Sequence, residues 1–208
     1  EAIRLAYRGA PWRVKLADDR FEFFFSPATG SLIQITNLQT DTTVARGQAD
    51  LFSLDYLPHN GTEIQSVPAE AVRFKGHELS DNPQQIDLLY DVQLPEGMSR
   101  VRCRAELPPD GLPTFRTEVT NGFEGLDIVE VHYPVVSGVR IGDDARDDRL
   151  IWPRWGMRDI PEAARNTPGR VLYPGGGANM PWMDLYQDGE DAQGLYMAAH
   201  DQTILVGA

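Results

Sequence analysis

The 208-residue sequence predicts an all-β fold, an antiparallel β-sandwich with almost no helix. Apolar and polar side chains alternate with a period of two in many segments, as they do in strands with one buried and one solvated face. Glycine (19 residues) and proline (15 residues) recur along the whole length and leave little room for long helices. Turn-forming residues separate the short strand-like segments, which favours a sandwich or barrel over an α/β fold.

The clearest alternation lies between residues 100 and 107. One face of this segment carries Val101, Cys103, Ala105 and Leu107, and the other carries Arg100, Arg102, Arg104 and Glu106. A matching segment begins at Phe115, after the turn-forming run Pro108–Gly111, so the two segments are predicted to be adjacent antiparallel strands. Because Cys103 points inward in this arrangement, the single cysteine is expected to be a buried, unreactive thiol.

Further strands are predicted at 21–25, 31–36, 50–57, 71–74, 86–92, 126–136, 182–186 and 194–199. One short helical turn is expected within 159–166. The region from about 138 to 181 is rich in Trp, Pro and Gly and shows little alternation, so long loops are predicted there. No linker composition interrupts the sequence, and residues 1–208 are therefore predicted to form a single sandwich domain.

The formal net charge of −12 disfavours nucleic acids and anionic membranes as partners, because both bind clustered Lys and Arg. No apolar run approaches the roughly 18 residues of a membrane helix. The sequence opens on Glu1 without a signal-peptide pattern and ends on the strand-like run 203–208. Both ends are therefore expected to be boundaries within a longer protein, with the sandwich truncated at its C-terminus. A periplasmic or secreted location is favoured over the cytoplasm.

Aromatic residues with interleaved planar polar groups gather in the loop-rich region. Sugars present apolar C–H faces and a rim of hydroxyls, so proteins bind them with stacked rings and hydrogen-bonding side chains. The predicted glycan-binding or domain-interface residues are Trp152, Arg154, Trp155, Tyr173, Asn179, Trp182, Asp184, His200 and Asp201. The alternative is that these rings cap the end of the sandwich or pack against another domain.

Other motifs point to no cofactor and no metal. The glycine run 175–177 lacks the Lys-Ser/Thr ending of a phosphate-binding loop. The acidic stretch 142–148 lacks the ligand spacing of an EF-hand. None of the four histidines shows His-x-x-x-His or Glu-x-x-His spacing, so the sequence does not support zinc. No nucleophile motif is present, and no catalytic residue is assigned.

Several segments resemble a known family. The run Phe21–Leu32, followed by Ile35–Asn37, resembles the opening hairpin of galactose-mutarotase-like supersandwich domains. The later runs Leu150–Pro153, Tyr173–Gly175, Met180–Tyr186 and Gly194–Asp201 occur in an order similar to the N-terminal region of a family of uncharacterised glycosidase-like proteins. The resemblance covers residues 20–208.

The resemblance implies that a (β/α)₈ barrel follows the sandwich and carries the catalytic carboxylates, and this chain contains no barrel. The leading prediction is a non-catalytic sandwich module of a glycoside hydrolase that packs on a C-terminal barrel of the same polypeptide and forms part of the glycan cleft. Three alternatives remain: a stand-alone carbohydrate-binding module, a protein-interaction domain, and a sugar epimerase or lyase. The last would take its acid and base from His132, His200, Glu130 and Asp201.

Overall fold

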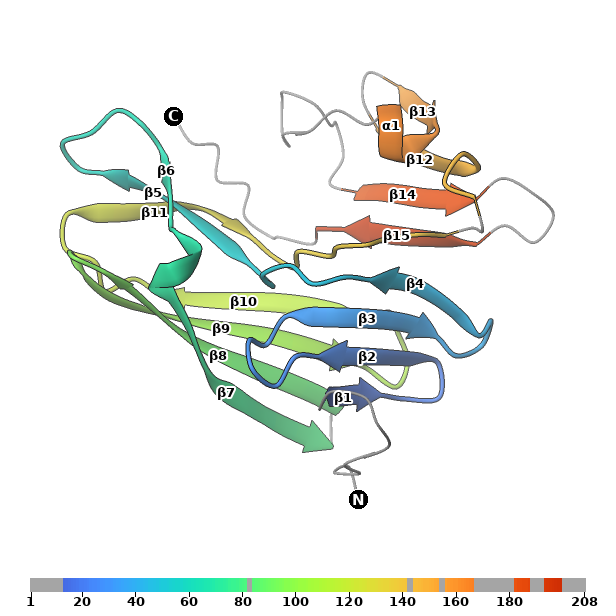
Figure 1. The fold of residues 1–208 in the computed structure, drawn as a ribbon, viewed down its shortest axis with the longest axis horizontal. Helices are drawn as coiled ribbons and strands as arrows, with labels where there is room; N and C mark the ends of the chain where they lie inside the picture. Colours follow the sequence, from blue (N-terminus) through green and yellow to red (C-terminus); the bar gives the residue numbers. More distant parts are fainter. Residues whose placement is uncertain are drawn as a thin grey trace. The chain divides into compact units, whose positions relative to one another are not determined.

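The computed structural model describes residues 13–81, 84–141, 144–153, 156–166, 182–187 and 193–199. Their strands form four antiparallel sheets, which confirms the predicted all-β, antiparallel class (Figure 1). The chain divides into two compact units, residues 1–139 and 140–208. Within the described part of the chain, no helix is long and apolar enough to cross a membrane.

The first unit contains three sheets, with strand orders β1-β2-β3-β4, β10-β9-β8-β7 and β11-β5-β6. Its elements are β1 (Val14–Ala17), β2 (Phe21–Phe25), β3 (Leu32–Asn37), β4 (Thr42–Arg46), β5 (Ser53–Pro58), β6 (Gln65–Ser66), the 3₁₀ turn η1 (Ala69–Ala71), β7 (Val72–Asp81), β8 (Gln84–Leu94), β9 (Gly97–Leu107), β10 (Thr114–Thr120) and β11 (Leu126–His132).

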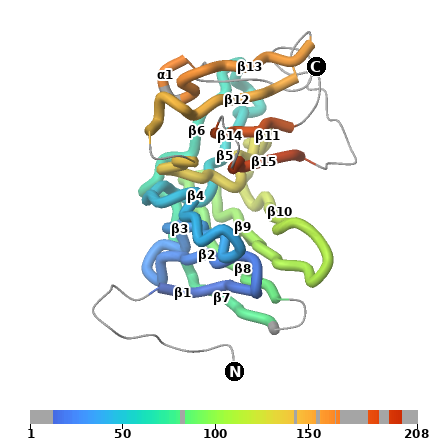
Figure 2. The backbone as a smooth tube through the Cα atoms, turned by 90° about the vertical axis from the view of Figure 1, so that its right-hand side faces the viewer, coloured from blue at the N-terminus to red at the C-terminus, as the bar shows by residue number. Residues whose placement is uncertain are grey.

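The second unit contains one sheet of order β13-β12-β14-β15 (Figure 2). Its elements are β12 (Asp148–Pro153), β13 (Met157–Pro161), the short helix α1 (Ala163–Asn166), β14 (Trp182–Gln187) and β15 (Gly194–Ala198). The helix falls within the segment predicted to carry one helical turn. Strands β12 and β13 lie inside the region 138–181 that was predicted to be loop, and this prediction was wrong for those residues. Their alternation is hidden because Ile151 and Pro153 place apolar groups on both faces.

The β8–β9 pair forms the centre of the first unit. The inward residues Ile86, Leu88, Val92, Val101, Cys103 and Ala105 are each at most 2% exposed. The register pairs Phe115 with Ala105 and Thr117 with Cys103, which confirms the predicted neighbouring strands. Burial raises the pKa of the Cys103 thiol to about 12, so the thiolate is scarce at neutral pH, as expected for an unreactive cysteine.

The sheet β1–β4 covers part of this apolar face. Phe23 of β2 is 2% exposed and meets Phe115 of β10 edge to face, with ring centroids 5.8 Å apart. Gly30, in the turn between β2 and β3, has a φ of +71°, and a Cβ there would overlap the Tyr90 hydroxyl. A side chain at this position would therefore separate the turn from β8.

The sheet β11-β5-β6 joins the same core through its central strand, β5. Leu54 of β5 is 1% exposed, and the preceding Phe52 packs against Tyr90 with centroids 4.9 Å apart. The pairing of β5 with β11 contains a β-bulge between Ile128 and Glu130. The bulge shifts the register, so Glu130 rather than Val129 lies opposite Asp55.

The outward face of the β8–β9 pair carries a largely buried ion pair. Asp87 and Arg104 lie directly opposite each other in the register. The Arg104 guanidinium donates two hydrogen bonds to the Asp87 carboxylate, at 2.7 and 2.9 Å. Only 7% of the Asp87 side chain is exposed, so the carboxylate depends on this bidentate partner for its charge compensation.

Arg104→Ala is expected to lower the free energy of unfolding by about 3 kcal/mol, because it leaves a buried carboxylate uncompensated. The matched control is Arg102→Ala, on the same face of β9, where the arginine is 46% exposed and 3.9 Å from Glu118. That change should cost less than about 0.5 kcal/mol. Urea denaturation of both variants measures the difference, and equal losses would contradict this role of Arg104.

Candidate functional site

The sheet of the second unit has one apolar and one polar, aromatic face. Leu150 of β12 pairs with Leu185 of β14, and both contribute to a small core with Trp152 and Ala163. Because side chains alternate along a strand, the intervening residues project from the opposite side. We call this opposite side the aromatic–carboxylate face; its residues are Arg149, Asp159, Trp182, Asp184, Tyr186 and Tyr196.

Two aromatic rings lie at one end of this face. Trp182 of β14 and Tyr196 of β15 lie with ring centroids 5.9 Å apart and planes tilted by 33°. Tyr196 is 50% exposed and Trp182 is partly buried. Trp182 pairs with Ala198 of β15, and Tyr196 of the same strand pairs with Asp184, so the backbone of the β14–β15 pair holds the two rings close together. Such a pair offers a platform on which an apolar ligand surface can stack.

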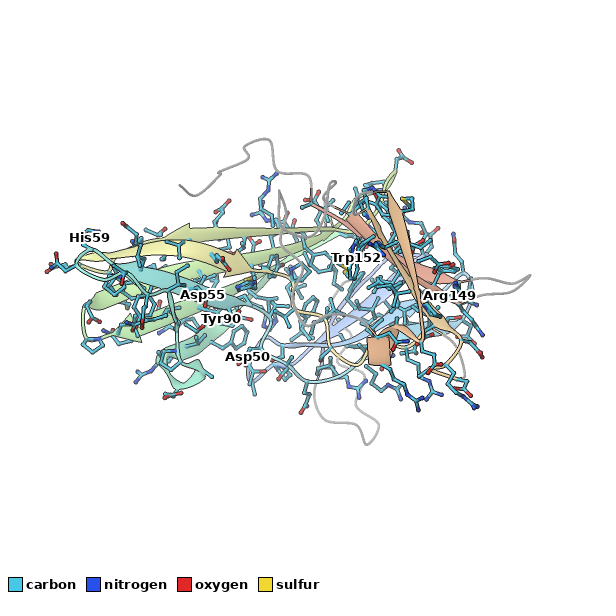
Figure 3. All side chains as sticks on the ribbon, turned by 90° about the horizontal axis from the view of Figure 1, so that it is seen from above. Asp50, Asp55, His59, Tyr90, Arg149 and Trp152 are labelled. Carbon is cyan, nitrogen blue, oxygen red and sulfur yellow. The ribbon has the colours of Figure 1, made fainter. Side chains whose placement is uncertain are left out.

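A cluster of polar side chains forms the other end of the face. The Arg149 guanidinium donates to both Asp159 carboxylate oxygens, at 3.0 and 2.6 Å, and to the Tyr186 hydroxyl, at 3.1 Å. The bonds to Asp159 raise the pKa of Arg149, and Arg149 in turn lowers the pKa of Asp159. Both groups therefore stay charged at neutral pH, and the Tyr186 ring is fixed in orientation (Arg149 is labelled in Figure 3).

Asp184 lies between these two groups. In the register it sits between Ile151 of β12 and Tyr196 of β15. Desolvation by its neighbours raises the pKa of Asp184, and no hydrogen bond from the described residues lowers it. Its carboxylate has therefore lost part of its hydration, and no hydrogen bond from the described residues replaces the lost water.

Gly194 keeps space for this carboxylate. A Cβ at position 194 would lie 3.0 Å from the Asp184 Oδ1 atom and 3.2 Å from the Tyr186 Cβ atom. These separations are closer than ordinary van der Waals contacts, so a larger residue would require Asp184 and Tyr186 to shift by a few tenths of an ångström. The small size of Gly194, the first residue of β15, therefore helps to hold Asp184 and Tyr186 in their positions on the aromatic–carboxylate face.

The residues predicted for this site do not all lie on the aromatic–carboxylate face. Trp182 and Asp184 lie together on the aromatic–carboxylate face. Trp152 does not, because it is 3% exposed and packs in the small core, where its ring cannot stack on a ligand (Figure 3). The predicted residues outside the described part of the chain are Arg154, Trp155, Tyr173, Asn179, His200 and Asp201.

Sequence reasoning missed Arg149, Asp159 and Tyr196. Tyr196 could have been found from the alternation within 194–198, since it projects from the same side as Gly194. Arg149 and Asp159 lie on β12 and β13, which were not recognised as strands, so no face could be assigned to them.

The acid and base considered for an epimerase or lyase fall partly in the first unit. His132 and Glu130 project from the same face of β11, with 3.3 Å between the His132 Nε2 and Glu130 Oε2 atoms. His200 and Asp201 lie outside the described residues.

Asp184→Asn is expected to increase the free energy of unfolding at pH 7, because the neutral amide avoids the desolvation of an ionised carboxylate. A raised pKa means that the native state binds protons more readily than the unfolded state, so native stability falls as pH rises above 3.8. The advantage of the variant should therefore shrink from pH 7 to pH 4. Urea denaturation across this range tests it, and a destabilised variant at pH 7 would contradict the assignment.

Comparison of the chain with protein-family models, curated proteins and solved structures returns no match. The family resemblance seen in the sequence therefore stays a prediction.

Proposed function

We propose that the chain is a non-catalytic β-sandwich module of a carbohydrate-active enzyme, a glycoside hydrolase, and that its aromatic–carboxylate face binds glycan. The observation that carries the proposal is the Trp182–Tyr196 ring pair with the Asp184 carboxylate beside it on one strand face. The rings match the apolar C–H face of a sugar, and the poorly hydrated carboxylate matches its hydroxyl groups.

The proposed binding mode follows from these groups. The apolar C–H face of a pyranose stacks on the Trp182 and Tyr196 rings. A hydroxyl of the same or the next sugar donates a hydrogen bond to Asp184, which restores the solvation that its carboxylate lacks. Beyond Asp184, the Tyr186 hydroxyl and the Arg149 guanidinium offer further hydrogen-bonding groups.

In the proposed fold, the sheets β1–β4 and β7–β10 are the two layers of a galactose-mutarotase-like sandwich. Support comes from the Phe23–Phe115 contact and from the close approach of Gly30 to Tyr90. In this proposal the catalytic carboxylates belong to a barrel in the same polypeptide, C-terminal to this chain, and the module forms part of the glycan cleft.

The charge of the chain restricts the glycan. With a formal net charge of −12, and with the Asp184 carboxylate on the face itself, the protein repels anionic chains at long range. The positive charge of Arg149 is offset by Asp159 at 2.6 Å. We therefore expect neutral oligosaccharides to bind and polyuronates to be excluded.

Trp182→Ala should weaken glycan binding at least 10-fold, roughly 1.4 kcal/mol, because it removes half of the stacking platform. The matched control is Met183→Ala, the next residue of β14, which is 36% exposed and projects from the other side of the sheet. Calorimetric titration with neutral gluco-, galacto-, manno- and xylo-oligosaccharides, and with an oligogalacturonate, measures the affinities.

Binding of a neutral oligosaccharide that is lost in Trp182→Ala and kept in Met183→Ala would support the proposal. Equal weakening in the two variants, tighter binding of the oligogalacturonate, or flat titrations of the wild-type chain with the whole panel would contradict it. Circular dichroism and thermal unfolding of each variant separate a lost binding surface from a lost fold.

A further inference from the structure

A cluster of metal-ligating side chains lies in the first unit, on the sheet β11-β5-β6. Asp55 comes from β5, and Glu130 and His132 come from β11. Their potential ligand atoms all lie within 4.8 Å of one another. We propose that these three residues form a binding site for a divalent transition-metal ion of the zinc type.

The two separations between the imidazole nitrogen and the carboxylate oxygens fit tetrahedral coordination. The His132 Nε2 atom is 3.2 Å from Asp55 Oδ2 and 3.3 Å from Glu130 Oε2. Zinc binds imidazole nitrogen and carboxylate oxygen at about 2.0–2.2 Å, which puts two tetrahedral ligands roughly 3.3–3.5 Å apart. Both measured separations therefore lie at or close to the edge length of a zinc tetrahedron.

Hydrogen bonding alone accounts less well for this geometry. A ring nitrogen of histidine carries at most one hydrogen, yet the same Nε2 atom faces two carboxylate oxygens. A single N–H can make one full bond or two weakened ones. A metal ion bound to Nε2 can be ligated by both oxygens at once, because each occupies its own coordination position.

The β-sheet itself forces the two carboxylates together. Glu130 lies directly opposite Asp55 in the register, and like charges in that position destabilise a strand pair. A divalent cation removes this repulsion. The combination of one imidazole and two carboxylates favours zinc and its neighbours over calcium and magnesium, which prefer oxygen ligands alone.

The surroundings resemble those of a metal site with an open position. The Ser66 hydroxyl donates a 2.6 Å hydrogen bond to Asp55 Oδ1 and so orients the carboxylate whose other oxygen faces His132. Side-chain exposure rises from 13% at Asp55 to 32% at Glu130 and 43% at His132. Solvent can therefore reach the site and supply a water molecule as the fourth ligand.

The same sheet provides a matched control. His59, in the turn after β5, lies 3.2 Å from Asp127 of β11 through its Nε2 atom. This exposed pair has the same kinds of donor and the same distance, but among the described residues only one carboxylate lies at the imidazole. Figure 3 shows His59 at the end of the sheet and Asp55 farther along the strand.

The test is titration of the untagged, chelator-treated 208-residue chain with Zn²⁺ alone, followed by calorimetry, and with Co²⁺, followed by its visible absorption. Wild type should bind one zinc ion per chain and give an intense tetrahedral cobalt spectrum. His132→Ala and Glu130→Gln should each lower the zinc affinity at least 10-fold, whereas His59→Ala should leave it unchanged.

Thermal unfolding with and without zinc guards against a variant that fails to fold, since a ligand that binds the native state raises Tm. Zinc should raise the Tm of wild type and of His59→Ala, and should raise that of the near-isosteric Glu130→Gln much less. The proposal would be overturned by an absence of saturable zinc binding to wild type. It would equally be overturned by unchanged affinity in Glu130→Gln and His132→Ala.

Discussion

The apolar face of the β8–β9 pair is the constraint on which the first unit depends. Ile86, Leu88 and Val92 of β8 have no measurable exposure, and the facing residues of β9 are nearly as buried. Such a face cannot remain in water, because each buried aliphatic side chain is worth roughly 1.5–3 kcal/mol. The Phe23–Phe115 contact and the closely packed Gly30 turn follow from the need to cover it.

In both units, side chains alternate along the strands, so residues next to buried ones project from the opposite side of the sheet and form the candidate sites. In the second unit, the small core around Leu150 and Trp152 holds one side of the sheet, so the other side is left to present Trp182 and Asp184. In the first unit, Leu54 points into the core while its neighbour Asp55 points to the opposite side, toward Glu130. Each candidate site is thus the reverse side of a packed face.

The sequence predicted the parts of the fold in which the alternation is uninterrupted. Residues 100–107 and 115–119 were placed correctly, including the buried thiol of Cys103. Strands β12 and β13 were missed because Ile151 and the prolines obscure the period. As a result, Trp152 was grouped with surface rings although it belongs to the core.

The candidate metal site was not predicted from the sequence, for a different reason. Zinc spacings of the His-x-x-x-His and Glu-x-x-His type describe helices, where ligands on one face are three or four residues apart. On a strand the equivalent spacing is two, as in Glu130 and His132. The third candidate ligand, Asp55, is 75 positions away from Glu130 in the sequence. A β-bulge brings the two residues opposite each other, and no sequence pattern predicted that bulge.

The proposed binding surface is tested most directly by finding which tryptophan contacts the glycan. The indole N–H signals of Trp182 and Trp152, assigned by Trp→Phe substitution, can be followed by NMR while a neutral oligosaccharide is added. If glycan binds the aromatic–carboxylate face, the Trp182 signal moves with saturation and the signal of Trp152, buried on the other side of the sheet, stays in place. A Trp152 signal that moves while that of Trp182 does not would contradict the assignment of the aromatic–carboxylate face as the binding surface.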